Sequence, residues 1–553
     1  MDDMFDRHRG LLETAVKALS DRGFWSPFPE IPSGKIYGET AKDDGESAFK
    51  ALLGTQLALP GHPEDRRLGS EKSPWGLDLD ILYPAADVAH LVAASAAAGD
   101  AWADASPEQR VGVCLEILVR LNRISFEMAN AVMHTTGQAF AMAFQAGGPH
   151  AQDRGLEAVA TAWVEMTRTP SQAIWEKPQG KAAPIVLEKN WQVVPRGIAL
   201  AIGCQTFPTW NSYPGLFASL ATGNTVIVKP HPGAILPLAL TVKVAREVLL
   251  EADFPADVVL LAVDQPGAEI TKELVTHPDI GIIDYTGSSA FGEWVRNNAG
   301  SAQVFTEEAG VNSIVIAATD DFSGMCANIA FSLSLYSGQM CTAPQDIFLP
   351  RDGIDTNEGR KSFDEVAAAI SAAVDALLDD PARASGVCGA IANPATLARV
   401  EEARSAGRLV RDSASLTAGR SATPLIVAVD AGKTTVHEEE CFGPVAFIVA
   451  VDSAEAGIDA AADLARSKGA ITAALYDTDE ARIAYAVKAF ARAGVNLSIN
   501  LTGNIFVNQS AAFSDFHVTG GNPAGNASLT DTAFVAHRLR RAMWRPPKAA
   551  EPA

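Results

Sequence analysis

The amino-acid sequence predicts an α/β fold with parallel sheets, and three observations support this prediction. Apolar runs with the length of a buried strand recur in the middle of the chain, for example at residues 197–204 and 225–228. They alternate with stretches of helical period, which favours parallel strands joined by right-handed crossovers. The 553 residues are 48% hydrophobic, which is enough for more than one core and excludes a disordered chain.

The N-terminal part of the chain precedes this alternation. After one helix at residues 9–19, residues 1–82 are rich in Pro, Gly and charge, so we expect a loop-rich extension. Its Trp25 and Phe28 indicate that it packs on the body of the protein. Residues 85–167 are Ala-rich, with apolar positions three and four apart, and this pattern predicts helices.

Two α/β units follow along the chain. A cofactor domain is predicted at residues 83–305, with strands at residues 197–204, 225–228, 258–263 and 280–285. Its helices are expected at residues 234–250, 267–275 and 288–298. A catalytic domain is predicted at residues 306–500, with strands at residues 313–317, 346–350 and 494–500 and helices at residues 325–337 and 363–378. Residues 501–553 are expected to form a C-terminal return segment.

Composition limits the partners of the protein. Asp and Glu number 66 and Lys and Arg number 44, a net charge of −22, so no nucleic-acid or anionic-membrane partner is expected. The six cysteines are scattered without a CxxC pair or a Cys/His cluster, which predicts reduced thiols and no metal site. No signal peptide is visible, and no apolar run reaches the ~18–20 residues of a membrane span. We therefore expect a cytoplasmic protein.

Two stretches have the character of a cofactor site. Thr286, Gly287 and Ser288, followed by Gly292, connect a predicted strand to a helix, where backbone N–H groups and the helix dipole suit a pyrophosphate. Lys229 ends an apolar strand at the edge where open α/β sheets bind ligands, so its ammonium can reach ribose hydroxyls or a 2′-phosphate. Taken alone, an ordinary turn and an exposed lysine explain these stretches equally well.

Three further stretches carry groups that can do chemistry. Cys341, in a Ser-Gly-Gln-Met-Cys-Thr turn, is a candidate nucleophile activated by neighbouring backbone N–H groups. Of Glu307 and Glu308, one can act as a general base with a raised pKa, and the other is expected in an exposed turn. In the Glu-Glu-Glu-Cys-Phe-Gly-Pro loop at residues 438–444, which includes Glu440 and Phe442, a carboxylate can bind a sugar hydroxyl, although three successive acids also fit a solvated face.

In order and spacing, these five stretches resemble the aldehyde dehydrogenase superfamily over residues 85–534. The matching motifs are Gly-Asn-Thr-Val-x-x-Lys-Pro, Thr-Gly-Ser-x-x-x-Gly, Glu-x-x-Gly, Gly-Gln-x-Cys and Glu-x-Phe-Gly-Pro. The resemblance implies a Rossmann-type cofactor domain, an α/β catalytic domain and a β-arm for oligomerisation. The arm would fall near residues 183–196 and pair with a strand near residues 530–540, giving a homodimer or homotetramer.

The same resemblance implies a reaction. Cys341 would attack an aldehyde to give a thiohemiacetal, and NADP or NAD would accept the hydride. The interval of 34 residues before Cys341 selects Glu307, not Glu308, as the base that activates water to release the acid. Lys229 and Glu440 would hold the two riboses of the cofactor, with the nicotinamide between the glycine turn and the Phe-Gly-Pro loop.

Three positions depart from the family pattern. Thr206 replaces an Asn that donates to the oxyanion, and Asn211 is the other candidate donor. Pro232 stands where an acid would repel a 2′-phosphate, and with His231 as an added donor this favours NADP over NAD. The Lys-Pro-His-Pro-Gly stretch is similar to the CoA-acylating branch, but that branch lacks the acid at Glu307, so hydrolysis to a free acid is favoured.

Within the superfamily, the long extension and the Gly-Gly-Asn-Pro-Ala-Gly-Asn stretch at residues 520–526 look like the PaaN type, which is associated with bacterial phenylacetate degradation. This resemblance implies a CoA-linked semialdehyde, formed when the ring opens, as the substrate, and a separate hydratase as a partner. The alternatives are a CoA-acylating aldehyde dehydrogenase and a catalytically weak binding or scaffold homologue. A thiol hydrolase is disfavoured because no motif places a His near Cys341.

Overall fold

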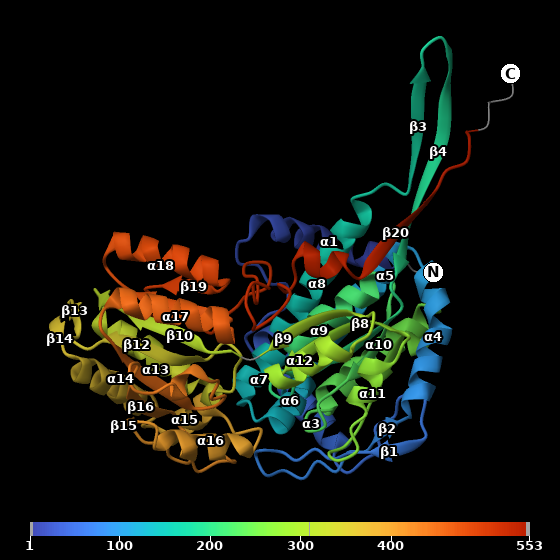
Figure 1. The fold of residues 1–553 in the computed structure, drawn as a ribbon. Coiled ribbons are helices and arrows are strands. Elements are labelled where there is room, and N and C mark those ends of the chain that lie inside the picture. The colour runs from blue at the N-terminus through green and yellow to red at the C-terminus, as the bar shows by residue number, and fades with distance from the viewer. Residues whose placement is uncertain (1–3, 309, 549–553) are drawn as a thin grey trace.

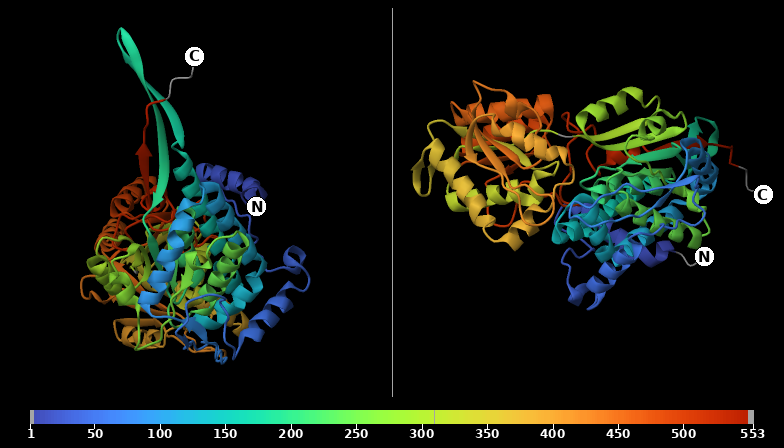
Figure 2. Two further views of the ribbon diagram at one scale, coloured as in Figure 1. Left: turned by 90° about the vertical axis from the view of Figure 1, so that its right-hand side faces the viewer. Right: turned by 90° about the horizontal axis from the view of Figure 1, so that it is seen from below.

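The molecule consists of two lobes, each built on a parallel sheet, and a hairpin that projects from one of them (Figure 1). The structure is a computed structural model that describes residues 4–308 and 310–548. The lobes lie side by side when the molecule is seen from below (Figure 2). The predicted α/β class with parallel sheets is confirmed.

The first lobe contains a five-stranded sheet in the order β7-β6-β5-β8-β9, with every pairing parallel. Its strands are β5 (Ile198–Ile202), β6 (Thr225–Lys229), β7 (Val259–Leu261), β8 (Ile280–Gly287) and β9 (Gln303–Glu308). Alternate residues enter different cores: Val226 and Val228 pack on one face, and Ile227 packs on the other. Because both faces are covered, the strands read as continuous apolar runs rather than as alternating ones.

Helices cover both faces of this sheet. Those connecting or following its strands are α9 (Pro208–Ala221), α10 (Leu236–Glu251), α11 (Thr271–Thr276) and α12 (Ser289–Asn298), with the 3-10 turn η1 (Ala256–Val258). Those preceding it are α4 (Val88–Asp104), α5 (Pro107–Arg123), α6 (Ser125–Thr136), α7 (Phe140–Gly147) and α8 (Pro149–Thr167). The helical period predicted for residues 85–167 is confirmed.

The second lobe contains a seven-stranded sheet in the order β15-β16-β17-β12-β10-β18-β19, in which only β15 is antiparallel. Its strands are β10 (Asn312–Ile316), β12 (Pro344–Pro350), β15 (Arg408–Arg411), β16 (Leu425–Asp430), β17 (Val445–Val451), β18 (Thr472–Tyr476) and β19 (Asn496–Ile499). Its helices are α13 (Phe322–Ser334), α14 (Phe363–Leu377), α15 (Pro381–Cys388), α16 (Ala395–Arg404), α17 (Ala454–Lys468) and α18 (Glu480–Ala493), with the 3-10 turns η2 (Leu335–Gly338) and η3 (Val436–Glu438). A small sheet of β11 (Ala318–Thr319), β13 (Ile354–Thr356) and β14 (Gly359–Lys361) lies at its end.

The projecting hairpin is formed by β3 (Gln172–Gln179) and β4 (Ala182–Pro195), and β20 (Leu539–Trp544) pairs with the other edge of β4. We call this three-stranded sheet the arm. After α18 and β19 the chain crosses from the second lobe back to the first, passes through α19 (Thr532–Ala536) and enters the arm (Figure 1). Residues far apart in the sequence therefore meet between the lobes.

The N-terminal extension is more helical than the sequence suggested. It contains α1 (Met4–Asp21), α2 (Gly34–Tyr37) and α3 (Ala41–Leu52), and β1 (Arg66–Leu68) pairs with β2 (Tyr83–Ala85). The expectation of a loop-rich segment was wrong for α3, whose charged face hides its period because only Phe49 is buried. Gly45 is no helix breaker here: a Cβ on it would lie 2.4 Å from the Cβ of Phe126, so glycine permits α3 and α6 to approach closely.

Among the described residues, no helix has both the length and the apolar character needed to cross a membrane.

Candidate active site

Cys341 lies in the turn between η2 and β12, where two contacts fix the backbone. The side-chain amide of Asn312 donates to the carbonyl oxygens of Cys341 and Ala343, at 2.8 and 2.9 Å. Gly338 has a φ of 63°, and a Cβ there would lie 2.3 Å from the carbonyl oxygen of Gly443. The glycine therefore allows the nucleophile turn to touch the Phe-Gly-Pro loop.

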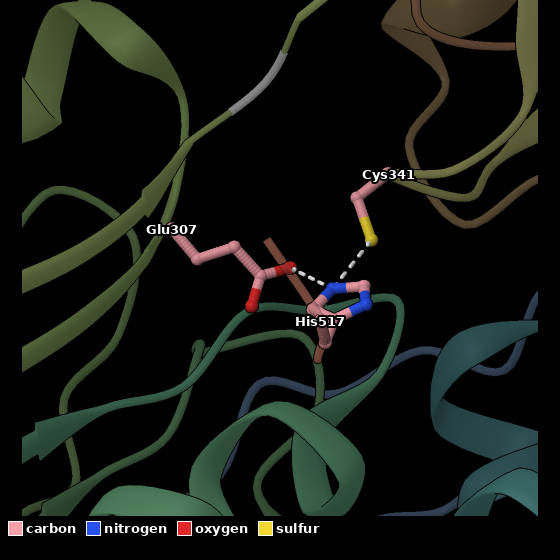
Figure 3. A group of neighbouring side chains, drawn as sticks. All are labelled: Glu307, Cys341 and His517. Atoms are coloured by element: carbon pink, nitrogen blue, oxygen red, sulfur yellow. Dashed lines mark hydrogen bonds and ion pairs between the residues drawn. The ribbon is translucent and has the colours of Figure 1, made fainter. Parts of the chain in front are cut away.

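Glu307 lies at the end of β9, directly opposite Thr286 of β8, and its side chain faces Cys341 across the space between the lobes (Figure 3). Its Oε1 lies 3.0 Å from Nε2 of His517, and its Oε2 accepts a hydrogen bond of 2.9 Å from Nδ2 of Asn211. The ligand atoms of Glu307, Cys341 and His517 all lie within 4.8 Å of one another. Hydrogen bonds within the group account for this closeness without a metal ion.

The ionisation of Glu307 differs from the expectation. Burial raises the pKa of its carboxyl, but the interactions with His517, Cys341 and Asn211 together lower it by a larger amount. The pKa therefore lies below its ordinary value. The prediction of a raised pKa was wrong because it counted burial without the donors that the fold brings to both oxygens. The carboxylate is ionised and ready to accept a proton.

The thiol of Cys341 shows the opposite shift. Burial raises its pKa well above the ordinary value, and the negative charge of Glu307 raises it further. A backbone hydrogen bond at Cys341 lowers the pKa, in the direction expected of neighbouring N–H groups, but burial and the charge of Glu307 outweigh it. The site therefore holds a protonated thiol beside an ionised carboxylate that can accept its proton.

His517 is the residue of this cluster that the motifs missed. It lies in the loop after β19, and its backbone exchanges hydrogen bonds with Leu529 at 3.1 and 3.0 Å. Its Nε2 lies 3.8 Å from the sulfur of Cys341, so a His does lie near this thiol although no motif places one there. The segment has neither helical nor strand period, and the only sequence signal was a histidine in a stretch of the chain that has few of them.

Of the two candidate oxyanion donors, Asn211 is the one that joins the site. It lies on α9, and its amide nitrogen binds Glu307 as described above, while its oxygen lies 3.4 Å from the sulfur of Cys204. Thr206 is held by its backbone oxygen, which accepts from the side chain of Gln138 at 2.8 Å. The hydroxyl of Thr206 contacts Cys204 at 3.9 Å.

The predicted cofactor lysine lies at the end of β6 and is already paired. Nζ of Lys229 lies 2.8 Å from Oδ1 of Asp264, and both side chains are almost fully buried. Nζ also donates to the carbonyl oxygen of Pro230 at 2.8 Å. His231 is exposed on the loop that follows, and its Nδ1 accepts from the backbone N–H of Gly233. The sequence did not predict the role of Asp264.

The glycine turn connects β8 to α12 as predicted. Thr286 and Gly287 end β8, and Ser288 is the N-cap of α12, although its hydroxyl makes no capping hydrogen bond. Gly292 packs against the side chain of Glu308. A Cβ at position 292 would lie 2.5 Å from the carboxyl carbon of Glu308, so glycine permits this close contact. Glu308 is buried and forms an ion pair with Arg296, so the expectation of an exposed turn was wrong.

Glu440 and Phe442 line a small cavity beside the nucleophile turn. Gly310, Asn312, Gly338 and Met340 line it as well. The carbonyl oxygen of Phe442 accepts from Nε of Arg399 at 3.0 Å, which fixes the Phe-Gly-Pro loop. Glu440 is exposed at this cavity.

Comparison with known proteins identifies the family. The model of the "Aldehyde dehydrogenase family" matches residues 82–524. The chain belongs to the aldehyde dehydrogenase family. It is 53% identical to an NAD-dependent aldehyde dehydrogenase from Burkholderia multivorans, whose crystal structure it matches with a TM-score of 0.98 over 99% of both chains.

More distant relatives share the fold. A 1-pyrroline-5-carboxylate dehydrogenase from Halalkalibacterium halodurans is 25% identical over 420 residues, which are 73% of this chain and 76% of that protein. An NADP-dependent glyceraldehyde-3-phosphate dehydrogenase from Bacillus halodurans, solved with NADP, is 19% identical, with a TM-score of 0.68 over 88% of this chain and 96% of that one. This aldehyde dehydrogenase is an oxidoreductase of the NAD(P)-dependent type.

The residues present fit a dinucleotide. Ser288, the N-cap of α12, makes no side-chain capping hydrogen bond, and this helix begins at the carboxyl edge of the sheet, where a pyrophosphate is bound in such folds. Lys229 at the end of β6 offers an ammonium to a ribose, and the cavity at Glu440 lies beside Cys341. When bound, the nicotinamide supplies the hydride acceptor.

Proposed function

We propose that this aldehyde dehydrogenase oxidises an aldehyde to the free carboxylic acid through a thioester on Cys341. The observation that supports it most directly is the Glu307 carboxylate, which is ionised, buried and in contact with the thiol. A carboxylate in this place can take a proton from a water that attacks the thioester. An enzyme that passes the acyl group to CoA has no need of such a base.

In this proposed reaction Cys341, Glu307 and Asn211 have different roles. The proton of the Cys341 thiol moves to Glu307 as the sulfur bonds to the aldehyde carbon, and the carbonyl oxygen takes the negative charge. Asn211, 2.9 Å from Glu307, is an amide donor within the same site. After oxidation the acyl group remains on sulfur, and Glu307, once it has released its proton to solvent, removes a proton from water as the thioester is hydrolysed.

Two variants test this assignment. We expect Cys341→Ala to lose NAD(P)-dependent oxidation of every aldehyde, and full activity in this variant would contradict the proposal. Glu307→Gln should still give a single turnover of reduced cofactor, slowed because the thiol has lost its base, and should lose steady-state turnover by about 100-fold or more, because the thioester persists. A screen of free and CoA-linked aldehydes with NAD and NADP, followed by reduced cofactor, identifies the substrate for these assays.

A CoA-acylating reaction is the rival outcome. The Lys-Pro-His-Pro-Gly stretch that resembles the CoA-acylating branch forms the loop after β6. Supplying CoA and measuring acyl-CoA against free acid separates the two reactions. Acyl-CoA as the main product would overturn hydrolysis, and cofactor binding without turnover of any aldehyde would favour a scaffold protein.

For the substrate we propose a CoA-linked semialdehyde, such as the one produced when the ring is opened in phenylacetate degradation. The support is the resemblance of residues 1–82 and 520–526 to the PaaN type. The second stretch has a structural role: Asn526 binds the backbone of β9 on both sides of Phe305, and Asn522 binds the carbonyl of Ala470 in the second lobe. A separate hydratase would be the partner that supplies the remaining step.

We propose NAD as the preferred cofactor. Pro232 removes one acid from the loop, but Asp264 neutralises Lys229, so no free cation remains there for a 2′-phosphate. Glu71, from the N-terminal extension, accepts from the backbone N–H groups of Ile235 and Leu236 at the start of α10. Its carboxylate therefore occupies helix N–H groups that could otherwise bind a phosphate.

We propose that the enzyme forms a homodimer or homotetramer through the arm and functions in the cytoplasm. Within the described part of the chain, the outer edges of β3 and β20 in the arm pair with no further strand, and both strands carry exposed apolar side chains. Such edges favour pairing with another chain. All six cysteines are free, as is usual in a reducing compartment.

A further inference from the structure

His517 is placed between the two residues that do the chemistry. Its side chain is 2% exposed, and the same ring nitrogen, Nε2, lies 3.0 Å from Glu307 and 3.8 Å from Cys341 (Figure 3). The other ring nitrogen, Nδ1, is buried and has no hydrogen-bond partner among the described residues. These contacts indicate which of the two ring nitrogens carries the hydrogen.

Only one tautomer fits the contacts. A lone pair on Nε2 would face the carboxylate of Glu307, so Nε2 carries the hydrogen and donates it. A second proton on Nδ1 would leave a buried donor unsatisfied, at a cost of about 1–3 kcal/mol. The ring is not arranged as the general base of a hydrolase triad, in which the two nitrogens face different partners.

We propose that His517 is a positioning residue of this enzyme, whose Nε2–H holds the Glu307 carboxylate against Cys341 for both proton transfers. This inference rests on the proposed hydrolytic function. One N–H donor reaches each carboxylate oxygen, His517 at Oε1 and Asn211 at Oε2, so the group cannot rotate away from the sulfur without breaking a hydrogen bond. Without His517, burial would be opposed by fewer donors, and Glu307 would bind its proton more tightly.

The fold around His517 supports a fixed ring. The indole of Trp210, next to Asn211 on α9, packs edge-on against it with 4.5 Å between ring centroids. Arg154 donates a hydrogen bond of 3.0 Å to the carbonyl oxygen of Asp515 and so fixes the backbone two residues before His517. The guanidinium of Arg22 lies 3.9 Å from the ring centroid of Phe516, so the N-terminal extension also contacts the segment that presents His517.

The test compares two substitutions. His517→Leu removes the donor and keeps the ring's bulk, whereas His517→Gln keeps an N–H near the place of Nε2. We expect His517→Leu to lower kcat about 10- to 100-fold with an unchanged Kd for NAD, and His517→Gln to recover most of the loss. The acid limb of the kcat–pH profile should move to higher pH in His517→Leu and return towards wild type in His517→Gln. As a control, His90→Leu changes an exposed ion pair and should leave the profile unchanged.

A double-mutant comparison keeps the result decisive even where His517→Leu lowers stability. If His517 acts through Glu307, adding His517→Leu to Glu307→Gln should slow thioester hydrolysis by less than twofold. Additive losses, or an unmoved acid limb in a folded His517→Leu enzyme, would overturn the proposal. Loss of activity in Cys341→Ala with normal activity in His517→Leu would leave the proposed function intact and refute only the role of His517.

Discussion

The ammonium of Lys229 lies 2.8 Å from a carboxylate oxygen of Asp264, and both groups are buried at the ends of neighbouring strands. Burial lowers the pKa of Lys229, and the negative charge of Asp264 partly offsets this. The pair therefore presents hydrogen-bonding groups but little net charge to a ribose. This arrangement suits a 2′-hydroxyl better than a 2′-phosphate.

Asp264→Asn should shift cofactor preference towards NADP. The amide keeps the shape of the side chain but frees the charge of Lys229, so we expect the ratio of kcat/KM for NADP to that for NAD to rise about tenfold, equivalent to ~1.4 kcal/mol. Asp253→Asn is the matched control, because this exposed residue has a φ of 60° that Asn accepts. An unchanged ratio in Asp264→Asn, measured by reduced-cofactor formation at limiting NAD and NADP, would contradict the argument.

Arg154→Met should destabilise the protein through the loop that carries His517. Arg154 and Glu157 form an ion pair of 2.9 Å with both side chains fully buried, and Arg154 also binds Ser510 at 2.6 Å. Removing the cation leaves a buried carboxylate, so we expect a loss of about 3–5 kcal/mol in the free energy of unfolding measured with urea. Replacing both partners, in Arg154→Met/Glu157→Leu, should recover part of the loss, whereas Lys17→Met, at the exposed pair with Asp21, should cost less than about 1 kcal/mol.

The site residues that could be predicted from the sequence are those that lie in a recognisable local motif. Cys341, Glu307 and Lys229 each end or follow a regular element, and their spacing identifies them without knowledge of packing. His517 and Asp264 could not be found in this way. Their roles come from contacts with residues 210 and 35 positions away, respectively, along the chain.

The ionisation states could not be predicted for the same reason. The sequence shows that a carboxylate in an apolar strand is buried, but not that His517 and Asn211 supply a donor to each oxygen. Likewise, Asn522 and Asn526, in the stretch at residues 520–526, have no periodic signal, because their partners lie after α17 and in β9, respectively. Helix α3 was missed because one buried aromatic is too little to establish a period.

Acid should loosen the contact between the N-terminal extension and the first lobe. His62 accepts from the backbone N–H of Leu261 in β7 at 2.9 Å, and burial, with the charge of Arg246, lowers its pKa to about 4. Since the unfolded residue titrates near 6.5, this stability is present above pH 6.5 and is lost as the pH falls towards 4. From pH 7 to pH 5 the loss should be about 2 kcal/mol.

His62→Gln isolates this effect, because the amide oxygen can still accept the hydrogen bond but does not titrate. We expect its free energy of unfolding to fall less than that of the wild type between pH 7 and pH 5, by the amount given above. His90→Gln, at an exposed histidine, should follow the wild-type curve. Parallel curves for His62→Gln and the wild type would show that His62 is not the group that titrates.

Charged substitutions on the arm should dissociate the enzyme without altering its chemistry. Ile174 on β3 and Trp544 on β20 are each 53% exposed, and each lies on an edge strand of the arm. A lysine at such an edge disfavours pairing with a second chain. We expect Ile174→Lys/Trp544→Lys to raise the dissociation constant of the oligomer at least about tenfold, or ~1.4 kcal/mol.

Sedimentation velocity measures this dissociation constant, and Leu250→Lys, at an exposed apolar residue near the end of α10, is the control. Because the arm lies outside the lobes that hold Cys341 and Glu307, single-turnover formation of reduced cofactor should be unchanged (Figure 1). An oligomer that withstands both substitutions would place the interface elsewhere on the molecule.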